Sequence, residues 1–207
     1  MATAMKSKQN LAILLLDFEK AYDKVDWAFL EGTMSCMGFS SNWITAVSAL
    51  YRNGSSKVML AGGKGESLIL SRSVRQGCPM APYIFLFFAE AMSSYLSDVV
   101  VGIQGLRIPH SMEELLDTEF ADHTSLYVQG TKTNLRMVEK ALEVFCLGSG
   151  AKINWSKTIA FWVSELPLPS WMPHPEFRWI PEGTAVKYLG CQVGIKIAPE
   201  LQIAPLL

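Results

Sequence analysis

Two aspartates stand at the ends of apolar runs, where a strand would deliver a polar side chain to the rim of a sheet. Asp17 follows the continuous apolar run from Leu11 to Leu16. Asp122 lies in the segment Phe120–Thr124, inside a predicted β-hairpin over Leu115–Val128. If the two strands are neighbours, both carboxylates emerge at one edge and could hold the divalent ions of a two-metal nucleotidyl transfer. On these two residues alone, two surface turns are the better interpretation.

The elements that must position these acids alternate irregularly between helix and strand, which favours an α+β fold over a doubly wound parallel sheet. Apolar spacing and glycine or proline punctuation set the expected boundaries. The expected helices cover residues 19–37, 41–51, about 79–95 and 133–147. The expected strands cover 11–16, 57–60, 68–71, 99–108, 115–128 and 186–193, with an irregular loop over 166–181.

Composition limits the function classes. The chain has 207 residues, of which 50% are hydrophobic and 18% charged, so we expect a sizeable core. A formal net charge of -1 is a poor electrostatic footprint for a free-standing nucleic-acid-binding protein. The four cysteines are far apart and form no CxxC pair, which predicts reduced thiols with no disulfide partner and no zinc site. With no targeting signal and no apolar run of membrane-spanning length, we expect an intracellular protein (cytoplasm or nucleus) that does not enter a membrane.

Five segments, in order, resemble the motifs of reverse transcriptases from non-LTR (LINE-type) retrotransposons. Leu14–Trp27 resembles the first palm motif, and Ser73–Pro82 resembles the second. The third is the Phe120–Thr124 hairpin, in which histidine replaces the family's second aspartate. The fourth and fifth are Leu147–Lys157 and Lys187–Gly190, the latter being the primer grip. The resemblance implies a reverse-transcriptase palm, an antiparallel sheet backed by helices, with partial fingers and no thumb over 11–195. Tails would cover 1–10 and 196–207.

The resemblance also implies roles for individual residues. The implied partners are an RNA template, a DNA primer and deoxynucleotides, with two Mg²⁺ ions as cofactors. Asp23 and Asp26 are better interpreted as charges favourable to a helix start than as metal ligands. Tyr22 would lie beneath the incoming sugar or be an ordinary core aromatic, and Lys152 would assist phosphate chemistry or be a solvated loop lysine. The implied metal ligands are Asp17, Asp122 and the Phe18 carbonyl; Arg75, Gln76 and Gly77 would line the nucleotide pocket; Leu189 and Gly190 would contact the primer terminus.

His123 is the departure that matters most. Imidazole is a poor ligand for Mg²⁺, and replacing aspartate removes a negative charge beside the cations, so we expect impaired metal binding, with Mn²⁺ as a possible substitute. The alternative is a turn residue that leaves folding intact. Few residues precede the first motif and the chain stops soon after the fifth, which predicts a weak grip on nucleic acid.

The sequence therefore predicts a degenerate, truncated copy of an RNA-directed DNA polymerase with little or no activity. The alternative is a non-enzymatic remnant of the palm that binds nucleic acid or a partner. A nucleotide cyclase is a third hypothesis, and the Arg75–Pro79 string argues against it.

Overall fold

A computed structural model describes residues 9–52, 54–75, 77–120, 122–171 and 177–198. The chain divides into two compact units. The first, called here the sheet unit, contains residues up to Asp17, Leu96–Ala141 and residues from Ile153 onward. The second, called the helical unit, contains Phe18–Tyr95 and Leu142–Lys152.

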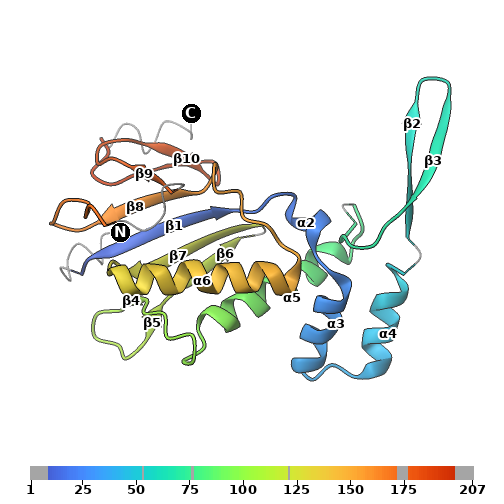
Figure 1. The fold of residues 1–207 in the computed structure, drawn as a ribbon, viewed down its shortest axis with the longest axis horizontal. Helices are drawn as coiled ribbons and strands as arrows, with labels where there is room; N and C mark the ends of the chain where they lie inside the picture. Colours follow the sequence, from blue (N-terminus) through green and yellow to red (C-terminus); the bar gives the residue numbers. More distant parts are fainter. Residues whose placement is uncertain (1–8, 53, 76, 121, 172–176, 199–207) are drawn as a thin grey trace. The chain divides into compact units, whose positions relative to one another are not determined.

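A five-stranded sheet in the order β6-β7-β1-β8-β9 organises the sheet unit (Figure 1). Its central strand β1 pairs antiparallel with β7 on one side and β8 on the other. Strands β6 and β7 form the predicted hairpin, and β9 joins β8 in parallel. The bounds are β1 (Leu11–Asp17), β6 (Asp117–Phe120), β7 (His123–Gln129), β8 (Ile159–Val163) and β9 (Arg178–Ile180).

The two faces of β1 are buried differently because successive side chains alternate. Leu11, Ile13 and Leu15 pack in one cluster with β8, with β9 and with the segment around β10. The even-numbered side chains Ala12, Leu14 and Leu16 are also buried. The first half of helix α6 (Lys132–Ser149) belongs to this unit and lies along the sheet (Figure 1). Because β1 is covered on both faces, its sequence is a continuous apolar run and not an alternation of apolar and polar residues.

Four parts of the sheet unit differ from the sequence expectations. The predicted strand 186–193 is instead a hairpin of β10 (Val186–Tyr188) and β11 (Cys191–Val193). The predicted loop 166–181 contains β9. Strand β8 was not predicted, although its sequence Ile-Ala-Phe-Trp-Val is a continuous apolar run. Only β4 (Leu106–Arg107), which pairs with β5 (Glu114–Leu115), forms within the strand predicted over 99–108.

The first helices of the helical unit differ from the sequence prediction. The helix predicted over 19–37 is two helices, α2 (Ala21–Lys24) and α3 (Trp27–Cys36). The break is a tertiary effect, because the backbone N–H groups of Ser73 and Val74 donate to the carbonyls of Val25 and Tyr22. Asp26 then caps α3 by accepting from the backbone of Ala28 and Phe29, 2.8 and 3.1 Å away, as predicted for a helix-start charge.

The remaining elements of the helical unit follow the expected order. Helix α4 (Ser41–Ala49) begins at the predicted residue, ends two residues before the predicted end, and is capped by Ser40. A two-stranded hairpin of β2 (Ser55–Leu60) and β3 (Gly63–Ile69) follows, and both strands are longer than the predicted 57–60 and 68–71. Helix α5 (Ala81–Leu96) begins between Pro79 and Pro82 and agrees closely with the helix predicted over about 79–95. Gly150, with a φ of +75°, follows α6.

The α+β architecture is confirmed. The predicted tails, over 1–10 and 196–207, lie largely outside the described residues, so the predicted domain bounds stay predictions. No helix in the described part of the chain is long and apolar enough to cross a membrane.

Candidate active site

Asp17 and His123 are direct partners across the β1–β7 ladder. Residues paired in this way have Cβ atoms about 4.5–5.5 Å apart and side chains on the same face. Asp17 is held by its backbone, since its N–H lies 3.4 Å from the Thr158 hydroxyl and its carbonyl accepts from Asn154 at 2.8 Å. Asp17, the last residue of β1, and His123, the first residue of β7, therefore lie at the same end of the sheet.

Asp122 stands beside His123 at this edge. The Asp122 Oδ1 and His123 Nε2 atoms are 3.9 Å apart, and their side chains are 46% and 35% exposed. We call Asp17, Asp122 and His123 the acidic edge. Among the described residues no group of three or more His, Cys, Asp or Glu side chains is arranged to hold a metal ion. The two carboxylates are hard oxygen donors that suit Mg²⁺, whereas the imidazole does not, so the donor set fits such an ion only in part.

Tyr188 covers the acidic edge from the β10 side. Its ring meets that of His123 edge-on, with centroids 5.5 Å apart and an interplanar angle of 76°. Its hydroxyl shares a 3.0 Å hydrogen bond with the Ser125 hydroxyl. Burial raises the pKa of Tyr188, against the opposing effect of the Ser125 hydrogen bond. Sequence reasoning assigned no role to Tyr188, although it immediately precedes the predicted primer-grip residues.

The predicted primer-grip residues form the turn between β10 and β11. Tyr188 pairs with Cys191, so the turn consists of Leu189 and Gly190 alone. Their φ angles are +50° and +82°, the signs of a type I′ hairpin turn. A leucine in this conformation is strained, and its side chain is 45% exposed.

Within the helical unit, Tyr22 and Lys152 both have local partners. The Tyr22 ring stacks on Phe85 with centroids 4.5 Å apart and planes 15° from parallel. Lys152 Nζ lies 3.1 Å from Glu19 Oε1, and the Lys152 carbonyl accepts from the Glu19 N–H at 2.8 Å. These contacts agree with the structural alternatives for both residues, a core aromatic for Tyr22 and an ordinary loop lysine for Lys152. Phe18 is buried and falls in this unit.

The second-motif segment, Ser73–Pro82, is held by contacts with residues that are distant in the sequence. Trp27 Nε1 donates to the Ser73 carbonyl at 2.8 Å, and Val74 is fully buried. Arg75 is exposed, and its Nη2 lies 2.6 Å from where a Cβ on Gly54 would be. Gly77 has a φ of +85° with open space around it, and Gln76 lies outside the described residues. Of the three predicted nucleotide-pocket residues, Arg75 and Gly77 can therefore be placed, and both belong to the helical unit.

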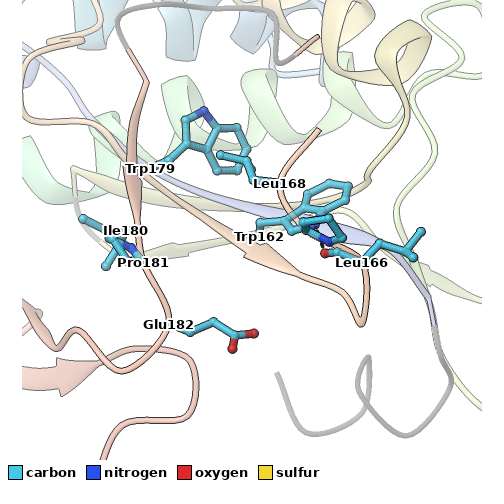
Figure 2. A pocket seen from close by; sticks show the side chains of 8 residues that line it. Trp162, Leu166, Leu168, Trp179, Ile180, Pro181 and Glu182 are labelled. Carbon is cyan, nitrogen blue, oxygen red and sulfur yellow. Dashed lines mark hydrogen bonds between the residues drawn. The ribbon is translucent and has the colours of Figure 1, made fainter. Parts of the chain in front are cut away.

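An apolar pocket lies elsewhere on the sheet unit, along β9. It has a volume of about 320 Å³, and its lining includes Trp162, Leu168, Trp179 and Pro181 (Figure 2). Trp162 Nε1 donates to the Leu166 carbonyl, and the carboxylate of the lining residue Glu182 pairs with Lys196 outside the pocket. Trp162 pairs with Ala12, five residues before Asp17, which places the pocket roughly 16 Å along the strand from the acidic edge. The pocket therefore lies apart from the acidic edge.

The five-stranded sheet and the helix that lies along it define a palm-type fold. Solved telomerases share this fold. The telomerase of Candida albicans, solved with a fragment of telomeric RNA, has a TM-score of 0.62 at 14% identity, covering 94% of this chain and 32% of its own. The telomerase of Candida tropicalis, solved without RNA and without its C-terminal domain, has a TM-score of 0.59 at 14% identity, covering 93% of this chain and 36% of its own.

Sequence comparison gives the family. Residues 1–193 match the model of the family described as "Reverse transcriptase (RNA-dependent DNA polymerase)", and the chain belongs to that family. Its members use divalent metal ions.

Two curated relatives come from transposable elements. The chain is 28% identical over 200 residues to the transposon TX1 uncharacterized 149 kDa protein of Xenopus laevis, and 23% identical over 217 residues to the retrovirus-related Pol polyprotein from the type-2 retrotransposable element R2DM of Drosophila melanogaster. These matches cover 96% and 95% of this chain but only 15% and 20% of the relatives' lengths. The resemblance to non-LTR retrotransposon reverse transcriptases is thereby confirmed.

Proposed function

We propose that this chain is the palm of an RNA-directed DNA polymerase from a LINE-type retrotransposon and that its metal site is impaired. The observation that carries the proposal is the β1–β7 register, which pairs Asp17 with His123 next to Asp122. This is where two carboxylates and a third ligand would be needed for nucleotidyl transfer. The curated relatives from transposable elements support the same assignment.

In this proposal Asp17 and Asp122 hold a divalent ion, Mg²⁺ in an unimpaired site. A bound pair of such ions would polarise the α-phosphate of a deoxynucleotide and stabilise the departing pyrophosphate. The strand pairing fixes Asp17, while Asp122 is carried by the turn of a two-stranded hairpin. His123 contributes no carboxylate, so the acidic edge holds one negative charge fewer than the family pattern provides.

The other predicted residues act on the substrates. Arg75 and Gly77, with Gln76, would contact the incoming nucleotide, and Tyr22 would lie below its sugar. Leu189 and Gly190 would contact the primer terminus, and their exposed, strained turn is suited to a contact rather than to packing. Lys152 is assigned only an ion pair with Glu19.

The proposed partners are an RNA template and a DNA primer. Support comes from the family match and from the likeness to telomerases, one of which was solved with RNA. The net charge of -1 predicts that binding is weak in isolation and falls further as salt is raised.

Primer extension on an RNA template tests the proposal. The unmodified chain is compared with His123→Asp, and with His123→Asp combined with Asp17→Asn as the matched inactive control. We expect little or no extension by the unmodified chain in Mg²⁺, more in Mn²⁺, and Mg²⁺-dependent extension by His123→Asp that the control lacks.

Two results would overturn parts of the proposal. Robust Mg²⁺-dependent extension by the unmodified chain contradicts the impairment. Salt-sensitive hybrid binding that Asp17→Ala leaves unchanged, with no extension by any variant in either metal, would instead identify a non-enzymatic binding remnant.

A further inference from the structure

We infer that Tyr188 is a positioning residue that fixes the Leu189–Gly190 turn to the strand carrying the acidic edge. On β7, Tyr188 contacts His123 and Ser125, which lie two residues apart and so face the same side of the sheet. Ser125 pairs with Leu15, two residues before Asp17 on β1. One side chain thus connects the proposed primer contact with the proposed metal edge. The functional part of this inference rests on the proposed function.

The hydroxyl bond is the specific part of this connection. Ser125 is 6% exposed, so its hydroxyl has little access to water, and the Tyr188 hydroxyl is the partner that lies 3.0 Å away. A buried hydroxyl without a partner lowers the free energy of unfolding. The Ser125–Tyr188 hydrogen bond therefore favours one placement of Tyr188, which a general apolar contact would not. The ring contact with His123 adds a second fixed point on the same strand.

The base of the β10–β11 hairpin is fixed separately. The backbone N–H of Gly183 donates to the Ile195 carbonyl at 2.8 Å, and a Cβ on Gly194 would lie 2.5 Å from the Thr184 carbonyl oxygen. Tyr188 therefore fixes the other end of the hairpin, next to the turn. A strained backbone such as that of Leu189 persists only where the surrounding structure holds it in place. Tyr188, the preceding residue, holds it through its contacts with His123 and Ser125.

A double-mutant cycle on the hydroxyl pair tests this inference. The variants are Tyr188→Phe, Ser125→Ala and their combination, and Ser125→Thr retains a hydroxyl as the conservative rescue. The matched control is Tyr127→Phe, which removes another tyrosine hydroxyl bond on the same strand, the 3.2 Å bond to Thr118.

Hydrogen exchange of the peptide covering residues 186–193 is the readout independent of substrate. We expect each single variant to speed exchange about fivefold, the value of one hydrogen bond, with no further increase in the combination. The rescue variant and the control should exchange like the unmodified chain. Unchanged exchange in both single variants, or an equal change in the Tyr127→Phe control, would overturn the inference.

Fluorescence of 2-aminopurine at the primer 3′ end of an RNA–DNA hybrid, at low salt, is the functional readout. We expect Tyr188→Phe and Ser125→Ala to reduce the terminus-specific signal without changing total hybrid binding, which a merely structural role would not separate. Accelerated exchange with an unchanged terminus signal would overturn the positioning role. If the unmodified chain binds no hybrid, the proposed function fails, while the exchange result still decides whether Tyr188 fixes the turn.

Discussion

Replacing His123 by aspartate should restore Mg²⁺ binding at the acidic edge. The site is half-exposed, since the Asp122 and His123 side chains are 46% and 35% accessible. Two unit charges 4 Å apart interact by about 4 kcal/mol at an effective dielectric constant of 20, and exposure reduces this substantially. We therefore expect a gain of roughly 1.5–3 kcal/mol in ion binding, which is about 10- to 100-fold in the Mg²⁺ dissociation constant.

Isothermal titration with Mg²⁺ at 0.1 M salt measures this gain. His123→Asn is the matched control, because it has a similar size and an oxygen donor but no charge. Since the new carboxylate lies beside those of Asp17 and Asp122, His123→Asp should also lower the free energy of unfolding by about 1 kcal/mol in chelator and recover it when Mg²⁺ is added. Equal Mg²⁺ affinities for the unmodified chain and His123→Asp, or an equal gain in His123→Asn, would refute the argument from charge.

The remaining predictions concern folding. Asp26→Ala removes the cap of α3 and should lower the free energy of unfolding by about 0.5–2 kcal/mol, which urea denaturation measures. Gly130→Ala would put a Cβ 2.3 Å from the Trp162 ring and should lower the thermal midpoint, whereas Gly148→Ala, in open space within α6, should raise it by replacing a helical glycine. Burial raises the pKa of Tyr51 to about 12 from 10.0, so its contribution to stability is complete below pH 10 and is lost as pH rises towards 12. The unmodified chain should lose about 1 kcal/mol between pH 9 and 11 that Tyr51→Phe keeps, as judged from urea midpoints.

The strands that carry the acidic edge could be predicted because their sequence signals are local. Leu11–Leu16 is a continuous apolar run ending in a charge, and β1 ends at Asp17 as expected. The hairpin over Leu115–Val128 was likewise visible from its residues. The register that pairs Asp17 with His123 was not, because it depends on the relative placement of strands far apart in the chain.

The errors came from tertiary contacts and from an unusual backbone. The helix predicted over 19–37 breaks where Val25 pairs with Ser73, a contact that periodicity does not reveal. The strand predicted over 186–193 reverses at Leu189 and Gly190, because a leucine adopts a left-handed conformation that sequence patterns assign to glycine or asparagine. Tyr188 lies in the predicted fifth motif, but a role of its own could not be predicted because its hydroxyl partner Ser125 is distant in the sequence.

A crystal structure of the unmodified chain with Mn²⁺, in which anomalous scattering locates the ions, tests the proposed metal site most directly. We expect one ion bound by the carboxylates of Asp17 and Asp122, with His123 paired across the strands from Asp17. Two fully occupied ions at this edge would contradict the impairment. Side chains of Asp17 and Asp122 on opposite faces of the sheet would contradict a shared metal site and, with it, the proposed function.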